Sequence, residues 1–373
     1  MKILQTPTRF YPHIGGTEQV AYHLSQKLIK KGHQVKVICA EDEPQLGNTI
    51  TDNITVKRLP FIGRIANTEI TLSLPKVLLK EDFEVIHTHL PHPWSADISA
   101  LVSLIRKKPL FLSYYNDIIG QGANNYIAQL YNLTALKFLL NRSHKIFLAH
   151  PKYIETSPFL KPFTEKIVIA PLGVDLDKFK SQNEPEPSEC PSIFFLSCLD
   201  KFHKYKGLEY LLLSIKKIIA KIPLKLYIGG DGELLEYYQG LVKDNGLEKV
   251  VFFLGRLTDE QVIAYFNSCD VFTLPSISAA QEGFGLVAVE AMACKKPLIV
   301  SEIVGTAKDV KEHQAGIVIP PKDVDALAQA LEYILTNKSK AQEMGNNGYQ
   351  LVINKYNWEN HANIVEAEYL KTI

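Results

Sequence analysis

Two carboxylates, Glu282 and Glu290, stand eight positions apart around a short glycine-bearing turn. An apolar, strand-like run at residues 270–276 leads into the turn, and residues 286–292 have the composition of a helix. This order predicts that Glu282 lies on a loop just beyond a strand and that Glu290 lies about one and a half turns into the next helix. A carboxylate at that place in the helix could accept hydrogen bonds from a ribose diol.

The backbone around Gly283, Phe284 and Gly285 adds a second feature. The N–H groups at a helix start have no partner inside the helix, so they could face an anion there. In open parallel α/β sheets, ligands bind at the edge where the strands end. Taken alone, however, the stretch is also explained by a glycine turn followed by a solvated helix, so the rest of the chain must decide.

Length and composition limit the class of protein. A chain of 373 residues is long for one hydrophobic core and suits two domains. The formal net charge of +1 gives no field of the kind that marks nucleic-acid binders, and no nucleic-acid partner is expected. The five cysteines lack C-x-x-C spacing, which favours a reducing compartment over a zinc or disulfide framework. No apolar run has signal-peptide or transmembrane length, so a cytoplasmic protein is expected.

Short apolar runs alternate with helical patterns through the first half of the chain. Strands are expected at residues 2–6, 35–39, 55–59, 83–87, 110–114, 145–149 and 166–170. A helical pattern follows the glycine pair Gly15 and Gly16 and ends at Gly32. The pair would let a ligand approach the backbone closely, although a structural tight turn explains it equally well.

A polar stretch at residues 181–188 is interpreted as a linker, which places the domain boundary between residues 180 and 181. Further strands are expected at residues 192–197, 224–228, 250–254, 271–274, 298–300 and 316–319, with helices between them. The predicted fold class is therefore α/β, with two tandem Rossmann-like, doubly wound domains that enclose a central cleft.

Polar clusters follow two strands of the first half. The first contains His87 and His89, which we interpret as hydrogen-bonding or packing residues because no carboxylate or cysteine stands beside them. The second contains Tyr115 and Asp117. Basic and bulky apolar residues also mix at residues 136–142, which form either a solvated basic face or a surface that lies on anionic membrane.

Several short motifs occur in a fixed order along the chain. They are PHIGGTE at 12–18, GHQV at 32–35, VIHTH at 85–89, PLGVD at 171–175, YKG at 205–207, GGDG at 229–232, E-x7-E at 282–290 and PPKD at 320–323. In this order they resemble the retaining glycosyltransferases of the GT-B fold, in particular family four, over nearly the whole chain. The resemblance implies an acceptor-side domain of residues 1–180, onto which a C-terminal helix of about 356–373 packs back, and a donor domain of residues 181–355.

The resemblance also implies the activity. A hexose would pass from a UDP- or GDP-linked sugar to a hydroxyl of a glycan or a lipid-linked acceptor, with retention of anomeric configuration. Lys206 would neutralise the diphosphate, Glu282 would lie near the hydroxyls of the donor sugar, and Glu290 would bind the ribose. The residues implied as catalytic are Lys206, Glu282 and Asp117. Those implied at the donor are Gly16, Lys201, Lys204, Gly230, Gly283, Phe284, Gly285, Leu286 and Glu290. Those implied on the acceptor side are Tyr115 and His89.

Four positions depart from the family pattern, and to one of them, Lys308 in place of a common acidic residue, we attach no function. Cys198 stands where an arginine is usual, and we hypothesise that Lys201 or Lys204 supplies the missing charge. Tyr115 replaces a common histidine, which leaves the sugar-side contact open. Lys295 stands where a helix-ending glycine is usual, at a cost of about 1 kcal/mol if it must adopt a left-handed conformation.

The expected mechanism is a front-face displacement without a covalent intermediate, a metal ion or a cofactor. The D-x-D triplet that begins at Asp323 is interpreted as a helix start rather than a metal site, and the triplet at Asp175 lies beside the linker. The acceptor site is expected near residues 61–80 and the basic segment. A sugar-nucleotide epimerase and a non-catalytic sugar-nucleotide-binding relative remain as alternatives. A NAD-dependent oxidoreductase is disfavoured because G-x-G-x-x-G is absent.

Overall fold

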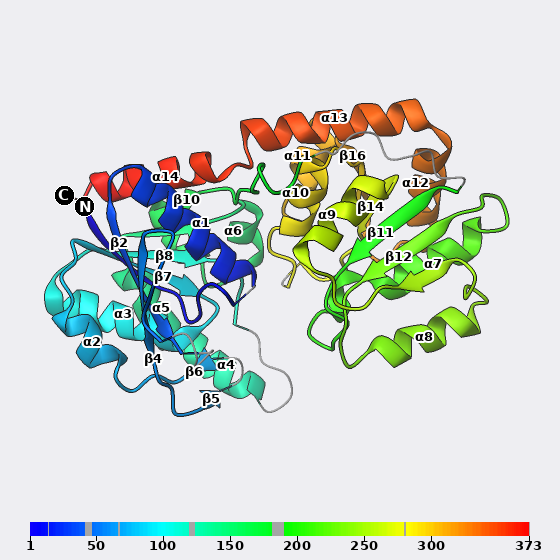
Figure 1. Ribbon diagram of the computed structural model, residues 1–373. Coiled ribbons are helices and arrows are strands. Elements are labelled where there is room, and N and C mark those ends of the chain that lie inside the picture. The colour runs from blue at the N-terminus through cyan, green and yellow to red at the C-terminus, as the bar shows by residue number, and fades with distance from the viewer. Residues whose placement is uncertain are drawn as a thin grey trace. The chain divides into compact units, whose positions relative to one another are not determined.

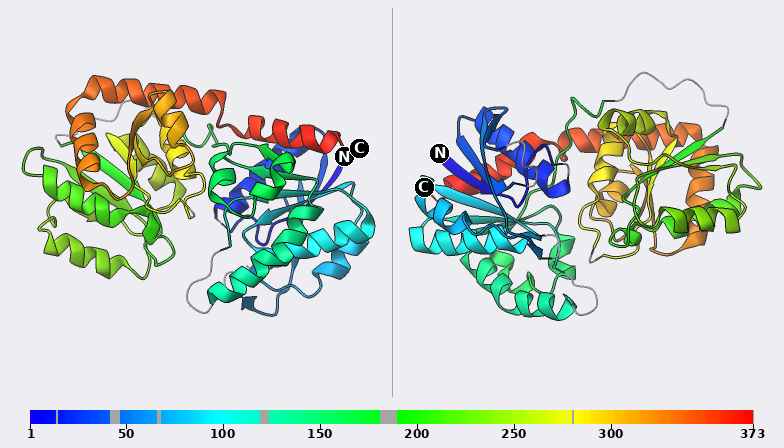
Figure 2. Two further views of the ribbon diagram at one scale, coloured as in Figure 1. Left: turned by 180° about the vertical axis from the view of Figure 1, so that it is seen from behind. Right: turned by 60° about the horizontal axis from the view of Figure 1, so that its bottom comes forward.

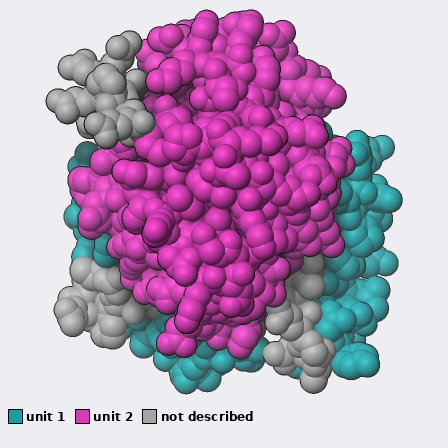
Figure 3. Space-filling model, turned by 90° about the vertical axis from the view of Figure 1, so that its right-hand side faces the viewer, with its two compact units in different colours: residues 1–172, 358–373 teal, residues 173–357 magenta. Residues whose placement is uncertain are grey.

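The structure is a computed structural model that describes residues 1–13, 15–41, 47–65, 68–118, 124–180, 190–279 and 281–372. The chain forms two compact units (Figure 3). Unit 1 comprises residues 1–172 and 358–373, and unit 2 comprises residues 173–357. The sequence placed the boundary later, between residues 180 and 181. The predicted linker at residues 181–188 lies outside the described residues.

Unit 1 is built on an eight-stranded sheet in the order β10-β9-β8-β7-β1-β2-β4-β3 (Figure 1). All its neighbouring strands are parallel except β3, which is antiparallel to β4. Its strands are β1 (Lys2–Thr6), β2 (Gln34–Ala40), β3 (Thr49–Thr51), β4 (Ile54–Leu59), β7 (Val85–Leu90), β8 (Leu110–Tyr114), β9 (Lys145–Leu148) and β10 (Ile167–Ile169), and β5 (Arg64–Ile65) pairs separately with β6 (Thr68–Glu69). Its helices are α1 (Gly16–Lys30), α2 (Leu74–Lys80), α3 (Pro93–Arg106), α4 (Asn124–Leu133), α5 (Ala135–Arg142), α6 (Lys152–Thr156), the 3₁₀ turn η1 (Lys161–Lys166) and α14 (Trp358–Leu370).

Alternating strand residues supply two separate hydrophobic layers in unit 1, as the two-residue period of a strand requires. Leu4 and Ile86 pack with residues of α2, α3 and α5. Ile3 and Val85 point to the other face, where they pack with residues of α1 and α14. Figures 1 and 2 show α1 and α14 on the face opposite α3 and α5. The C-terminal helix therefore completes the core of unit 1.

Unit 2 contains a six-stranded parallel sheet in the order β13-β12-β11-β14-β15-β16. Its strands are β11 (Ser192–Leu196), β12 (Lys225–Gly229), β13 (Val251–Phe253), β14 (Val271–Leu274), β15 (Leu298–Ser301) and β16 (Gly316–Ile319). Its helices are the 3₁₀ turn η2 (Lys204–Lys206), α7 (Leu208–Ile218), α8 (Leu235–Asp244), α9 (Asp259–Ser268), α10 (Leu286–Ala293), α11 (Ala307–Glu312), α12 (Val324–Thr336) and α13 (Lys338–Asn354). Each strand that the sequence predicted is present, within one to three residues at its ends. The short strands β3, β5 and β6 were not predicted, because two or three residues show no periodic pattern.

The helix that carries Glu290, α10, is held from behind by α13. Two glycines of α13 make this approach close: a Cβ on Gly345 would lie 2.0 Å from the carbonyl oxygen of Lys295, and one on Gly348 would lie 2.9 Å from the Cγ of Met292. Lys295, for which a cost was expected only if the residue were left-handed, does adopt that conformation, with φ at +56°. The end of α10 and the glycine face of α13 therefore form one rigid contact.

Two glycine-to-alanine changes in unit 2, one inside this contact and one outside it, are expected to have opposite effects on stability. Gly345→Ala is expected to destabilise unit 2 by about 1–3 kcal/mol, because its methyl group would meet backbone that cannot move aside. Gly240→Ala, in the interior of α8, is expected to stabilise the unit by about 1 kcal/mol, because nothing lies within 4 Å of the added methyl group and alanine favours a helix. Thermal unfolding of the two variants measures both; a lower melting temperature for Gly240→Ala or an unchanged one for Gly345→Ala would contradict the packing.

Candidate functional site

The carboxyl ends of the unit 2 strands form the edge at which a parallel sheet binds ligands. Beyond the strand ends, three neighbouring chain segments stay hydrogen-bonded: Ser197 N–H donates to the Gly229 carbonyl at 3.1 Å, Gly230 N–H to the Gly255 carbonyl at 2.8 Å, and Leu199 N–H to the Asp231 carbonyl at 2.9 Å. A Cβ on Gly230, whose φ is +125°, would lie 1.8 Å from the Ser197 carbonyl oxygen. Gly230, predicted as a donor contact, thus lets these segments pack side by side.

Lys206 and Glu282 meet at this edge. Gly207 ends the η2 turn with φ at +80°, and a Cβ there would lie 2.1 Å from the Pro275 carbonyl oxygen. The N–H of Ile277 donates to the Tyr205 carbonyl at 2.7 Å, so the turn is held against the segment that follows β14. The result is an ion pair in which Lys206 Nζ lies 2.7 Å from Glu282 Oε2. Two residues 76 positions apart in the sequence are thereby brought into contact.

The pair is buried and further tied down. The side chain of Glu282 is 4% exposed and that of Lys206 is 14% exposed. Ser276 Oγ donates to Glu282 Oε2 at 2.6 Å, and Ser301 Oγ donates to the Ser276 carbonyl at 2.5 Å. Burial by itself lowers the pKa of Lys206, but the Glu282 carboxylate and the Tyr205 phenol outweigh it and raise the pKa above its usual value. Lys206 is therefore a fixed, fully charged ammonium.

The turn after Glu282 has the geometry that the sequence predicted. Gly285 is the N-cap of α10 with φ at +80°, and a Cβ at Gly305 would lie 2.5 Å from the Gly283 carbonyl oxygen, so the turn is closely packed from one side. The backbone N–H groups of Gly283, Phe284 and Gly285 donate to no described residue. They are available to an anion in the way that free N–H groups at helix starts usually are.

Glu290 lies in α10, away from the ion pair. It is half-buried, and its carboxyl group makes no hydrogen bond or ion pair with any residue in the described part of the chain. Its electrostatic neighbours are Lys178 and Asp259, whose own charges pair at 2.6 Å. Burial raises the pKa of Glu290 to about 8, Asp259 adds to the rise and Lys178 partly offsets it. A carboxyl group with unused acceptor capacity suits a neutral, hydroxyl-rich ligand.

Lys201 and Lys204 do not join this cluster. Lys201 Nζ pairs with Glu233 at 3.3 Å, and Lys204 Nζ pairs with Glu209 at 2.9 Å and lies 5.0 Å from the ring centre of Tyr237. Each lysine is thus already paired with a carboxylate, and neither forms a hydrogen bond or ion pair with Lys206 or Glu282. The hypothesis that one of them supplies the charge missing at Cys198 gains no support from this geometry.

Metal ligation has one candidate in the described residues. Ligand atoms of Cys198, Asp200 and His203 lie within 4.8 Å of one another, and the imidazole Nδ1 of His203 is 2.8 Å from Asp200 Oδ1. The two D-x-D triplets have other roles. Asp323 is the N-cap of α12 and accepts the Ala326 N–H at 2.9 Å, as predicted, and Asp175 accepts the N–H of Asp177 at 2.9 Å in a turn.

The remaining predicted residues lie in unit 1. Gly16 begins α1, and no atom lies within 4 Å of the position that a Cβ would occupy there. His89 is fully buried: its Nε2 lies 2.8 Å from Gln5 Oε1 and its Nδ1 lies 3.0 Å from the Tyr115 hydroxyl. Burial lowers the pKa of His89 to about 3, so the ring is neutral. The half-buried Tyr115 is the member of this pair that can reach a ligand.

Asp117 is held by two hydroxyl groups. Its Oδ1 accepts from Tyr114 at 2.5 Å and from Ser157 at 2.8 Å. It lies on the segment that follows β8, at the edge where a ligand is expected in unit 1. Asp117 and the predicted donor residues of unit 2 thus belong to separate compact units.

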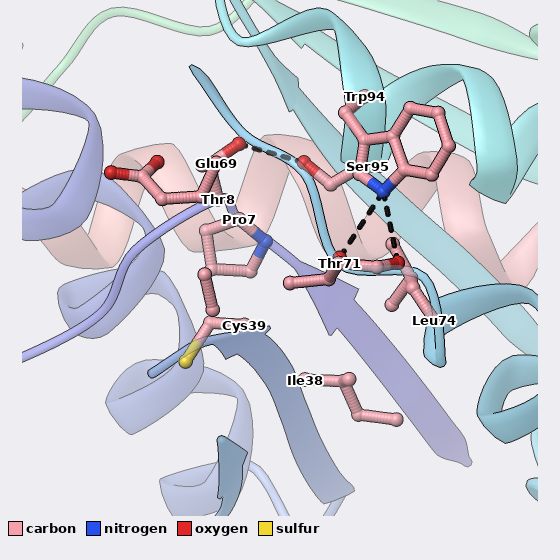
Figure 4. A pocket seen from close by; sticks show the side chains of 10 residues that line it. Pro7, Thr8, Ile38, Cys39, Glu69, Thr71, Leu74, Trp94 and Ser95 are labelled. Carbon is pink, nitrogen blue, oxygen red and sulfur yellow. Dashed lines mark hydrogen bonds between the residues drawn. The ribbon is translucent and has the colours of Figure 1, made fainter. Parts of the chain in front are cut away.

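A small pocket opens at the ends of β1 and β2 in unit 1 (Figure 4). Trp94 and Ser95, at the start of α3, line it together with Glu69 and Thr71. Glu69 is buried and accepts from Arg9 Nε at 2.8 Å, and Trp94 Nε1 donates to the Thr71 carbonyl at 3.1 Å. The pocket includes part of the region, residues 61–80, that the sequence assigned to the acceptor.

Sequence reasoning missed two charged residues beside the donor-side positions. Lys178 acts on Glu290, and Arg256 acts on the Cys198 thiol together with Lys206. Neither belongs to a motif. Lys178 lies between the PLGVD motif at 171–175 and the predicted linker at 181–188, and Arg256 follows Gly255 just beyond β13. A charged residue two positions after a predicted strand was the one available signal for Arg256.

Comparison with known proteins identifies the class. Residues 178–351 match the family model described as glycosyl transferases group 1, and residues 14–178 match glycosyltransferase family 4. The structure is similar to that of Anabaena Alr3699/HepE in complex with UDP, with a TM-score of 0.80, 18% identity and full coverage of both chains. The fold is therefore the GT-B fold, with two Rossmann-like domains.

Two relatives match over most of the chain. O-antigen chain mannosyltransferase C of Escherichia coli is 28% identical over 93% of this chain and 92% of its own. D-rhamnosyltransferase WbpZ of Pseudomonas aeruginosa is 28% identical over 90% of this chain and 86% of its own. The two family models together span residues 14–351. This chain belongs to the group 1 glycosyltransferases.

Proposed function

We propose that this enzyme transfers a hexose from a UDP- or GDP-linked sugar to a hydroxyl of a glycan or lipid-linked acceptor, with retention of anomeric configuration. The buried ion pair between Lys206 and Glu282, beside the free N–H groups of the turn that begins at Gly283, is the observation that carries the proposal. It combines a fixed cation, a fixed carboxylate and backbone donors. The cation and the backbone donors can stabilise a departing diphosphate, and sugar hydroxyls can donate hydrogen bonds to the carboxylate.

In the proposed front-face step, the bond between the anomeric carbon and the diphosphate oxygen breaks as the acceptor oxygen bonds to the same face of that carbon. The acceptor's proton passes to the phosphate oxygen that has just been released. Lys206 and the N–H groups of Phe284 and Gly285 stabilise the charge that develops on the diphosphate. No protein nucleophile takes part, and Glu290 accepts hydrogen bonds from the ribose.

The names of similar proteins are consistent with either donor class. One relative is a mannosyltransferase, another is a D-rhamnosyltransferase, and one structural neighbour was solved with UDP-glucose. A thermal-shift panel of UDP, GDP and their glucose and mannose conjugates separates the nucleotides, because a tight ligand raises the melting temperature by mass action. If no member of the panel raises it, the donor assignment fails.

The product then tests the reaction. With the donor chosen by the panel, and with glycan and lipid-linked acceptors, NMR of the product is expected to show the anomeric configuration of the donor. A changed sugar nucleotide in the absence of acceptor would identify an epimerase instead. Tight nucleotide binding without turnover on any acceptor would identify a non-catalytic relative.

We also propose that transfer requires no metal ion or cofactor. Lys206 and the backbone donors provide the positive charge that a divalent cation would otherwise supply to the diphosphate. Turnover is expected to be unchanged after dialysis against EDTA and in the presence of added Mg²⁺ or Mn²⁺. Activity lost on chelation and restored by a metal ion would contradict this, and the Cys198, Asp200 and His203 group would then be the first site to test.

A lipid-linked acceptor would bring unit 1 to a membrane surface, and α4 has the required face. Its exposed apolar residues fall on one side of the helix, at Tyr126, Ile127, Leu130 and Leu133, each at least 64% exposed. The neighbouring α5 exposes Lys137 and Phe138, whereas Arg142 donates to the Ser103 and Lys108 carbonyls and so faces the protein. No helix in the described ranges is long and apolar enough to cross a bilayer. We propose that α4 lies on anionic lipid.

Vesicle co-sedimentation tests this surface. Leu130→Ser is expected to reduce binding to vesicles of phosphatidylglycerol and phosphatidylcholine several-fold. Ile50→Ser, which replaces an equally exposed apolar residue on β3, is the matched control and should bind as the wild type does. Equal loss in both variants, or no binding by the wild type, would remove the membrane role of α4.

A further inference from the structure

A second cation stands at the carboxyl edge of the unit 2 sheet, on the opposite side of Gly230 from Lys206. Arg256 follows β13, Gly230 follows β12 and Cys198 follows β11, and these strands are neighbours in the sheet. The hydrogen bond from Gly230 N–H to the Gly255 carbonyl and the one from Ser197 N–H to the Gly229 carbonyl hold the three segments together. The backbone at Arg256 is thus two strand spacings, about 10 Å, away from the backbone at Cys198.

The charge of Arg256 is felt across this gap, because it acts on the thiol of Cys198. Gly230 between them carries no side chain, and a Cβ there would collide with the Ser197 carbonyl. Burial raises the pKa of the Cys198 thiol, Asp200 adds to the rise, and the charges of Lys206 and Arg256 both oppose it. Two cations on different loops therefore both contribute positive potential at Cys198.

Arg256 differs from the other cations of this edge in having no counter-charge. It is exposed, and within the described residues its side chain makes no hydrogen bond or ion pair. By contrast, Lys201 pairs with Glu233, Lys204 pairs with Glu209 and Lys206 pairs with Glu282. The charges of Arg256 and Lys206 both act on Cys198, and the guanidinium of Arg256 has no partner in the described residues. Its parallel N–H donors suit the oxygens of a phosphate group.

We propose that Arg256 and Lys206 bind the diphosphate of the donor between them, over Cys198, with Arg256 taking the role that the sequence suggested for Lys201 or Lys204. This inference rests on the proposed function, since it assumes a nucleoside diphosphate as ligand. Because Arg256 is exposed and unpaired, its removal leaves no buried group without a partner. Its effect is confined to the ligand.

The test compares the affinities of a nucleoside diphosphate and its monophosphate. UDP and UMP, and GDP and GMP, are titrated calorimetrically into the wild type, Arg256→Ala, Arg256→Lys and the control Lys201→Ala. Arg256→Ala is expected to weaken the diphosphate at least tenfold and the monophosphate less. Arg256→Lys should recover part of the loss, and Lys201→Ala should bind as the wild type does. All variants should keep the wild-type melting temperature.

The outcomes separate the two proposals. If the wild type binds neither UDP nor GDP, the proposed function itself is wrong. If the wild type binds one of them and Arg256→Ala binds it equally well, the function stands and the role of Arg256 is refuted. A loss in Lys201→Ala as large as that in Arg256→Ala would also refute it, because it would show a diffuse effect of positive charge rather than a specific contact.

Discussion

Replacing Lys206 with methionine is expected to lower kcat by roughly 10²–10³-fold, the usual loss when one preorganised charge-stabilising group is removed from a transition state. The ammonium is placed by the turn at Gly207 and by Glu282, and the raised pKa keeps it charged. Methionine keeps much of the side-chain volume but provides no charge for the departing diphosphate. Lys216→Met on α7 is the control, because within the described residues that ammonium hydrogen-bonds to Asn245 alone, and it should retain wild-type turnover.

Stability complicates this test, because the variant leaves the Glu282 carboxylate buried without its partner. Breaking a buried ion pair from one side costs about 3–5 kcal/mol, and less where one partner is partly exposed, as Lys206 is. The double variant Lys206→Met with Glu282→Gln removes both charges and should regain most of the lost melting temperature, since Ser276 can still hydrogen-bond to the amide. Its turnover should stay low. Wild-type turnover in a stable double variant would show that the pair serves the fold alone.

Strand positions were predictable because buried parallel strands are short apolar runs separated by polar turns, and all six strands of unit 2 gave that signal. The loop that carries Glu282 and the helix that carries Glu290 followed from the same pattern. The ion pair between Lys206 and Glu282 did not. It depends on the left-handed Gly207 and on the contact of its turn with Pro275, which no local spacing specifies.

The exposed lysines illustrate the limit more clearly. Lys201 and Lys204 lie close to Lys206 in sequence, so both were reasonable candidates for an extra charge at the diphosphate. Their side chains instead reach Glu233 and Glu209, and sequence distance does not show which carboxylate a long flexible side chain will meet. Arg256, 50 positions further along than Lys206, follows a strand of the same sheet edge because β11, β12 and β13 are neighbours, and its charge acts on Cys198 as that of Lys206 does. The order of the strands in the sheet, rather than any sequence motif, determines which charged residues share this edge.

Glu290 gives the second large expected effect, and its sign follows from its pKa. The group titrates near pH 8 in the folded protein and near 4.5 when unfolded, so the folded state binds the extra proton between these values. Its contribution to the free energy of unfolding is therefore fully present below pH 4.5 and is lost as the pH rises to about 8. Glu290→Gln, which carries no titrating charge, should be more stable than the wild type above pH 8 and nearly equal to it near pH 4.5.

The size of this difference follows from 1.4 kcal/mol per pKa unit. Since Glu290 is only half-buried, we count about half of the rise to about 8, which corresponds to roughly 2 kcal/mol at pH 8.5. Melting temperatures of both proteins from pH 4.5 to 8.5 measure it, and parallel curves would contradict the assigned titration. Glu248→Gln, at an exposed carboxylate of unit 2, is the control.

The same carboxyl group should make nucleotide binding pH-dependent. Two ribose hydroxyls donate more strongly to a carboxylate than to a neutral carboxyl group, so binding favours the ionised form and releases a proton. The affinity for the nucleoside diphosphate should therefore rise from pH 7 to pH 8.5 in the wild type and stay level in Glu290→Gln, which should bind at least tenfold more weakly at pH 8.5. The variant that is more stable at alkaline pH is thus expected to be the weaker binder. A ribose site that lay elsewhere would leave the affinities of the two proteins equal at every pH, even if their stabilities differed.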